Sequence, residues 1–419
     1  MTRTSSDEFA DRRRSSRTWT PWQAIVGFGL VSLTADMLYE GMRAMAGPFL
    51  GTLGASALTV GLVTGAGEGI ALVLRLVTGP WADRSHRHWR LTVVGYAMTA
   101  VCVPLLAVTP FLGGAGLAVA SLLILLERTG KAVRSPAKSA LLARMAQPTG
   151  RGRGFAVHKA LDQVGAFSGP LLLAGVAALT GLLWPGFALL AIPGALSLVL
   201  LAVLRRRVPG LADPDPEEQA PVSAQRRAAA RAVGRDLPRT FHRFSLAAAF
   251  ATAGLMTFGV MAYRFVEDGL LSPAAIPLVY ALGMAVAGVA ALATGDAFDR
   301  WGPRTLVVVP PLVAVVPLLV FANAVGLVLL GIGIWGVANG IQDSSVKAYV
   351  ADLVPAGRRA TAYGVFAAVQ GIGALAGGAL AGALITDHVA VLASVITLLQ
   401  VGSLALLWPT TRRRSTSPG

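Results

Sequence analysis

The sequence predicts an all-α membrane protein in which twelve transmembrane helices form two pseudo-symmetric six-helix bundles. Three observations carry this prediction: the composition, the alternation of apolar segments with basic connections, and an internal repeat. Of the 419 residues, 54% are hydrophobic and only 14% are charged, and the mean hydropathy is +0.64. A soluble domain carries roughly a quarter charged residues. The composition therefore places the chain in a bilayer.

Twelve segments are apolar enough and long enough to cross the hydrocarbon core, which takes about 20 residues of helix. They lie near 22–48, 56–80, 91–110, 114–136, 155–180, 184–204, 244–266, 273–297, 304–323, 325–350, 361–385 and 388–409. A segment rich in proline and charge separates the first six from the last six. The predicted organisation is a tail (1–21), a first bundle (22–204), a cytoplasmic linker (205–243), a second bundle (244–410) and a second tail (411–419).

The basic residues lie in alternate connections between these segments. They occur in the first tail, in 83–90, 144–154, 205–243, 299–304 and 355–359, and in the last tail, whereas the intervening connections contain no Lys or Arg. Because Lys and Arg favour the cytoplasmic side, we expect both termini and the linker in the cytoplasm and the chain in the cytoplasmic membrane. The net charge of +15 then reflects topology and contact with anionic lipids, and no nucleic-acid partner is predicted.

One part of the chain occurs twice. The segment 127–170 runs out of one apolar span, through a basic connection and into the next span, and 340–378 repeats this layout. Gly130 aligns with Gly340, and the GAFSGP sequence of 165–170 aligns with the GALAGG sequence of 373–378. Two halves built alike are typical of transporters.

A shorter motif also occurs twice, each time between the second and third span of a half. We expect its glycines to let helices approach closely, and its aspartates to cap a helix or to pair with a basic neighbour. The matching positions are Gly79, Asp83, Arg84 and Arg87 in the first copy, and Gly295, Asp299 and Arg300 in the second.

These two motifs resemble the loop motif of the major facilitator superfamily. His86 stands where the family usually has glycine, and Pro303 is a second departure. The resemblance extends over essentially the whole chain, and it implies a central cavity with alternating access by rocking of the two bundles. It also implies that the motif residues act as a conformational latch and not as a substrate site.

The fifth span contains Gly165, Gly169 and Pro170, which resemble the antiporter motif of drug–proton exchangers in this superfamily. The match is partial, because Leu173 and Ala174 stand where glycines are expected. The resemblance favours export. The alternative is ordinary close packing of helices around small residues.

Charged residues inside the predicted spans are the candidates for proton coupling and for lining the substrate cavity, since such residues are costly in a bilayer. Most lie in the first half, where several follow helical spacing. The candidates are Asp36, Glu40, Arg43, Glu68, Glu127, Arg128, Lys131, Arg134, His158, Asp162, Asp343 and Lys347.

Each candidate has a structural alternative. Asp36 lies about 20 Å along its helix, near the bilayer midplane, and is either a proton carrier or part of a static ion pair with Arg43 or Lys131. The basic face of the fourth span either attracts an anionic substrate or holds the first-span acids in place. His158 is either a proton relay or a solvated residue near the cytoplasmic interface.

Three further residues complete these expectations. Lys138 is interpreted as a topology signal beyond the membrane edge. Asp343 and Lys347, four residues apart, are expected to form an internal pair. Gln370 occupies the place of Asp162 in the repeat, so we expect charge chemistry to be concentrated in the first half.

Enzymatic and metal chemistry find little support in the sequence. It contains no H-E-x-x-H, G-x-S-x-G, Walker or CxxC motif, and its one cysteine, Cys102, provides neither a disulfide framework nor a cysteine-based metal site. We therefore expect no cofactor and no enzymatic activity.

The sequence thus indicates a monomeric, proton-coupled exporter whose partners are a small-molecule substrate, protons and membrane lipids. The alternatives are a proton-coupled importer of an organic anion or nutrient, and a non-transporting membrane sensor or assembly partner.

Overall fold

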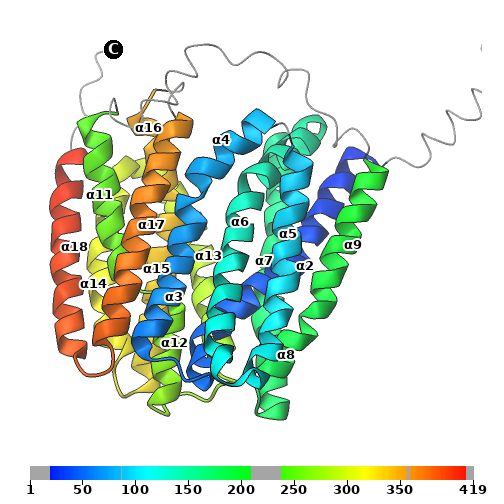
Figure 1. Ribbon diagram of the computed structural model, residues 1–419. Helices are drawn as coiled ribbons and strands as arrows, with labels where there is room; N and C mark the ends of the chain where they lie inside the picture. Colours follow the sequence, from blue (N-terminus) through cyan, green and yellow to red (C-terminus); the bar gives the residue numbers. More distant parts are fainter. Residues whose placement is uncertain (1–18, 86, 209–236, 356–358, 412–419) are drawn as a thin grey trace, which may run out of the picture.

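The computed structural model describes residues 19–85, 87–208, 237–355 and 359–411. All regular secondary structure in these residues is helical, which confirms the predicted fold class. The predicted linker lies largely outside the described residues, as do most of both tails. Figure 1 shows two groups of helices side by side, with the first half on the right and the second half on the left.

The first half contains six crossings of the bundle. Some crossings are built from two successive helices, because a break or a 3-10 turn interrupts them. The helices are α2 (Pro21–Thr52), α3 (Ala57–Val73), α4 (Arg75–Ser85), α5 (His88–Leu105), α6 (Gly116–Ala146), α7 (Arg151–Thr180), α8 (Trp184–Leu189) and α9 (Ala191–Arg207).

The second half repeats this organisation. Its first crossing is interrupted near Met256, a non-glycine residue with a φ of 53°. The helices are α11 (Arg239–Gly254), α12 (Phe258–Glu267), α13 (Ile276–Trp301), α14 (Val309–Val320), α15 (Val325–Asp343), α16 (Ser345–Leu353), α17 (Arg359–Leu384) and α18 (Val389–Thr411).

Ten stretches of the described residues are long and apolar enough to cross a membrane. One of them, Ile276–Val320, includes both α13 and α14, joined by a 3-10 turn over Gly302–Val308. Helix α6 adds a further crossing that its charged residues exclude from an apolar count. Together these give the twelve predicted crossings, although α6 extends about three turns beyond the predicted end at 136, to Ala146.

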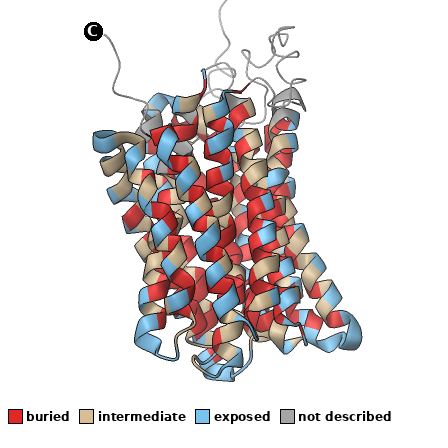
Figure 2. Ribbon diagram, turned by 90° about the vertical axis from the view of Figure 1, so that its left-hand side faces the viewer, coloured by how far each residue is buried: buried red, intermediate tan, exposed pale blue. Residues whose placement is uncertain are grey.

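The connections with basic residues lie at one end of the bundle. The linker and the chain after α18 are at the top in Figure 1, and the short connections without Lys or Arg are at the bottom. We refer to these as the linker end and the short-loop end. On the lateral surface, Figure 2 shows alternating exposed and buried residues along each helix. The exposed residues include large apolar side chains such as Leu179 and Leu292, as expected for a lipid-facing surface.

Close helix packing confirms the internal repeat. A Cβ atom built on Gly165 of α7 would lie 2.1 Å from the carbonyl oxygen of Leu33 on α2. Four residues later, Gly169 meets Met37 in the same way. In the second half, Gly373 and Gly377 of α17 approach the carbonyl oxygens of α11 equally closely. The alternative interpretation of the glycines in the fifth span, close packing, is therefore correct as a description of their contacts.

The two halves meet most closely through small residues. A Cβ on Gly61 of α3 would lie 2.2 Å from the carbonyl oxygen of Gly378 on α17. At the short-loop end, a Cβ on Gly47 of α2 would lie 1.8 Å from the carbonyl oxygen of Gly259 on α12. These backbone approaches leave no room for a side chain, so both contacts require glycine.

Candidate functional site

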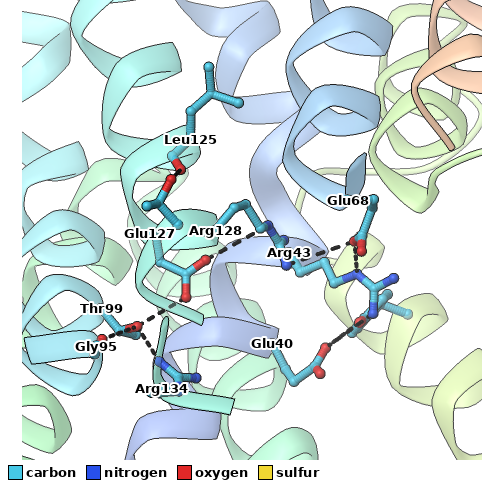
Figure 3. Close-up of polar contacts among 11 residues, drawn as sticks. Glu40, Arg43, Glu68, Gly95, Thr99, Leu125, Glu127, Arg128 and Arg134 are labelled. Atoms are coloured by element: carbon cyan, nitrogen blue, oxygen red, sulfur yellow. Dashed lines mark hydrogen bonds and ion pairs between the residues drawn. The ribbon is translucent and has the colours of Figure 1, made fainter. Parts of the chain in front are cut away.

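Helix α2 brings three charged side chains to the interior. Its first turn is fixed by Thr20, whose side chain accepts a hydrogen bond from the backbone N–H of Gln23. Farther along, Arg43 places its Nε atom 3.1 Å from a carboxylate oxygen of Glu68 on α3. A guanidinium nitrogen of the same arginine lies 3.9 Å from Glu40. One half of the predicted static pairing, Arg43 with a first-span acid, is thus present (Figure 3).

Helix α6 extends this arrangement. Arg128 lies 3.8 Å from Glu68 and 3.7 Å from Glu127. Glu127 is fully buried, and it accepts a hydrogen bond of 3.1 Å from the hydroxyl of Thr99 on α5. We call Glu40, Arg43, Glu68, Glu127 and Arg128 the charged cluster. Three helices supply it, and each of its carboxylates has a cationic or hydroxyl partner (Figure 3).

Two other cations of α6 have aromatic partners. The Nζ atom of Lys131 lies 3.2 Å from the centre of the Tyr39 ring. The guanidinium of Arg134 lies 4.9 Å from the centre of the Tyr96 ring and donates a hydrogen bond to Thr99. Among the described residues neither cation has a carboxylate within ion-pair distance. Aromatic rings stabilise such cations only modestly.

A second polar group lies nearer the linker end, and we call it the His158 cluster. The hydroxyl of Ser32 lies 3.0 Å from Nε2 of His158 and 3.0 Å from the hydroxyl of Tyr96. Asp162, one turn along α7, lies 3.3 Å from Nζ of Lys138. The cluster consists of Ser32, Tyr96, Lys138, His158 and Asp162.

This cluster corrects two expectations. His158 is only 4% exposed, so it is not a solvated interfacial residue. Lys138 is not merely a topology signal, because α6 continues past the predicted membrane edge and directs this lysine to Asp162. The sequence did contain a signal, since Lys131, Arg134 and Lys138 follow helical spacing.

Asp36 differs from every other acidic candidate of the first half. It is half-buried on α2, and it makes no hydrogen bond or ion pair with any described residue. The charges nearest to it belong to Asp162, Lys138, Arg134 and Glu40. A carboxylate in this position can be neutralised by a proton or by a ligand.

One hydrogen bond of the charged cluster crosses between the halves. The hydroxyl of Tyr280 on α13 donates to Glu40 on α2, and both residues are buried. A second link joins the hydroxyls of Thr64 on α3 and Thr257, the residue before α12, at 2.7 Å. The sequence gave no indication of these residues, since a single tyrosine or threonine in an apolar segment is common.

The second half holds uncharged groups at the corresponding positions. The hydroxyl of Thr252 on α11 donates to Gln342 at 3.0 Å and accepts from Gln370 at 3.3 Å. Asp343 is exposed, and a break at Ser344 separates it from α16, so the expected continuous helical spacing with Lys347 is wrong. The side chain of Lys347 lies outside the described residues.

The motif residues lie at the linker end, away from both clusters. The expectation that Gly79 and Gly295 permit close helix packing is wrong, because no atom would lie within 4 Å of a Cβ at either position. Asp299 lies within α13 and caps no helix, and Arg300 pairs with Asp296 at 2.9 Å. The side chains of Asp83 and Arg84 lie outside the described residues, and Arg87 is exposed.

Within the described residues, no group of three or more His, Cys, Asp or Glu side chains is arranged to hold a metal ion. What the geometry defines is a polytopic α-helical membrane protein with two repeated halves and a charged interior in the first. Comparisons with known proteins identify the family. The family model of the Major Facilitator Superfamily matches residues 24–309 and 244–419. The chain belongs to this superfamily.

Relatives and solved structures agree with this assignment. An uncharacterised protein of Mycobacterium tuberculosis is 46% identical over 388 residues, which cover 92% of each chain. An uncharacterised MFS-type transporter of Methanocaldococcus jannaschii is 25% identical over 373 residues, covering 84% of this chain and 86% of the relative. The crystal structure of the nucleoside transporter NupG has a TM-score of 0.72 at 16% identity, covering 92% of this chain and 98% of that one. A POT family transporter in complex with 5-aminolevulinic acid has a TM-score of 0.71 at 14% identity, covering 92% and 95%. These two structures support the fold alone.

Proposed function

We propose that this transporter of the major facilitator superfamily exchanges a small organic solute for protons across the cytoplasmic membrane, working as an exporter. The observation that carries the proposal is Asp36, an interior carboxylate without a partner among the described residues. A single such carboxylate can be neutralised either by a proton or by a solute, but not by both at once. Competition of this kind produces exchange.

The surrounding charges support a dedicated site at Asp36. The charged cluster satisfies Glu40, Glu68 and Glu127 with arginine, tyrosine or threonine partners. These acids are expected to keep a fixed charge, since removing a partner from a buried pair is costly. Titration during transport is therefore assigned to the carboxylate that lacks such partners. Export is supported by the resemblance of Gly165, Gly169 and Pro170 to the antiporter motif.

Transport against imposed pH gradients tests the proposed direction. Purified protein would be reconstituted into proteoliposomes with an internal pH dye, and lipophilic cations, organic anions, sugars and amino acids would be added in turn. Exchange predicts that addition of a substrate outside drives protons out of an acid-loaded lumen. Movement of substrate and protons in the same direction would contradict exchange and would establish symport.

One observation favours a second candidate, proton-coupled uptake of an organic anion. Lys131 and Arg134 face the interior with aromatic and hydroxyl partners but without a carboxylate. Two such cations on one helix can attract an anionic substrate. In the same assay this candidate predicts anion-dependent proton entry, which is lost in Lys131→Met.

A further inference from the structure

The inference concerns the crossing of α2 and α7 and its counterpart in the second half, α11 and α17. The close approach of Gly165 to Leu33 is matched by that of Gly373 to Ala249. Residues of α2 therefore correspond to residues 216 positions later, and residues of α7 to residues 208 positions later. The second close approach, one turn farther along each helix, gives the same two offsets.

This register places two aspartates where the second half has a hydrogen-bonded pair. Asp36 corresponds to Thr252, and Asp162 corresponds to Gln370. In the second half the amide of Gln370 donates to the hydroxyl of Thr252 at 3.3 Å. The same helix crossing in the first half directs the two aspartates toward each other, and Asp162 is the first of the charges that surround Asp36.

The surroundings of the two aspartates are unequal. Asp162 has Lys138 at 3.3 Å, Lys159 at 3.8 Å and His158 at 3.9 Å. Asp36 has no ion pair of its own among the described residues. Helix α6 contributes the two nearby cations, Lys138 and Arg134, α2 itself contributes Glu40, and α5 contributes Tyr96, bonded to Ser32.

We propose that Asp36 and Asp162 form a carboxyl pair that binds a single proton between α2 and α7, and that this pair is the proton-binding site of the transporter. The inference rests on the proposed proton coupling and assigns its chemistry. Two carboxylates that face each other repel when both are ionised, and one shared proton removes this repulsion. Lys138 and Arg134 stabilise the ionised pair, so the proton is bound reversibly. The pair titrates as a unit.

The pair can be tested without knowing the substrate. Infrared difference spectra of the full-length protein in lipid would be recorded as the pH is lowered, and the carbonyl stretching band of a protonated carboxyl group followed. We expect this band in the wild type and its loss in Asp36→Asn. In Asp162→Gln we expect the band to appear at a pH lower by about one unit or more, because the repelling charge is gone while Lys138 remains.

Two variants control for misfolding and for surface acids. The double variant Asp36→Thr with Asp162→Gln recreates the pair of the second half, so we expect it to fold and to lack the titration. Asp387→Asn changes an exposed aspartate in the turn before α18 and should leave the band unaltered.

Three results would overturn the proposal. One is an unchanged band in Asp36→Asn, and another is an unmoved midpoint in Asp162→Gln, which would make Asp36 a lone acid. The third is a titration displaced by Na⁺ in place of choline, which would indicate a cation site. Proton flux measured separately in proteoliposomes decides the proposed function, so a lone acid with intact coupling would sink only the pair.

Discussion

Tyr280 on α13 donates a hydrogen bond to Glu40 on α2, and so joins the second half of the transporter to the charged cluster of the first. Both residues are buried, and Glu40 also lies 3.9 Å from Arg43. The contact therefore connects the interface between the halves directly to the network of ion pairs. Any relative movement of the halves that separates α2 from α13 must break it.

Tyr280→Phe is expected to loosen this contact. Removing the hydroxyl deprives a buried carboxylate of one donor, at a cost of about 1–3 kcal/mol to the arrangement in which α2 and α13 meet. Spin labels at Thr52→Cys and Ser272→Cys, exposed residues of the short-loop end, would report the distance between the halves in a Cys102→Ala background. We predict a broader distance distribution in Tyr280→Phe. An unchanged distribution would show that the hydrogen bond does not hold the halves together.

Gly165→Ala is expected to destabilise the first half. The new methyl group would meet the carbonyl of Leu33 at 2.1 Å, and such overpacking costs about 1–3 kcal/mol. Gly175→Ala on the same helix is the matched control, because no atom lies within 4 Å of its Cβ position. Thermal unfolding in detergent should show a lower midpoint for the first variant only. Equal midpoints would argue against close packing as the role of this glycine.

Arg43→Leu is expected to reduce stability more than Lys131→Met. Arg43 pairs with both Glu68 and Glu40, so its loss weakens two carboxylates at once and costs about 2 kcal/mol. Lys131 contacts the ring of Tyr39, and losing this contact costs about 1 kcal/mol or less. The two thermal unfolding midpoints, measured under the same conditions, give the comparison. A larger loss for the lysine variant would mean that its charge has a partner role in folding.

Much of the fold could be predicted from the sequence, because a bilayer demands long apolar helices and leaves basic residues to mark the connections. The twelve crossings and the repeat of GAFSGP and GALAGG follow from these demands. The end of α6 could not be predicted, because the lysine at 138 looks like a membrane boundary until Asp162 is seen beside it.

The candidate site was predictable in its charged residues and not in their pairing. Spacing along one helix identifies Asp36, Glu40 and Arg43 as one face, but their partners come from other helices. The Tyr280 contact joins residues 240 positions apart, and no local pattern specifies it. The motif glycines at 79 and 295 were misassigned to packing for a related reason, since a small residue does not reveal whether a second helix is nearby.

Substrate-dependent proton flux in proteoliposomes tests the central claim, proton coupling at Asp36, most directly. Wild-type protein and Asp387→Asn are predicted to move protons when a transported solute is added. Asp36→Asn is predicted to lose at least about 90% of this flux while keeping the wild-type unfolding midpoint, since an amide cannot carry the proton. Wild-type proton flux in Asp36→Asn would contradict the account and would make this aspartate structural.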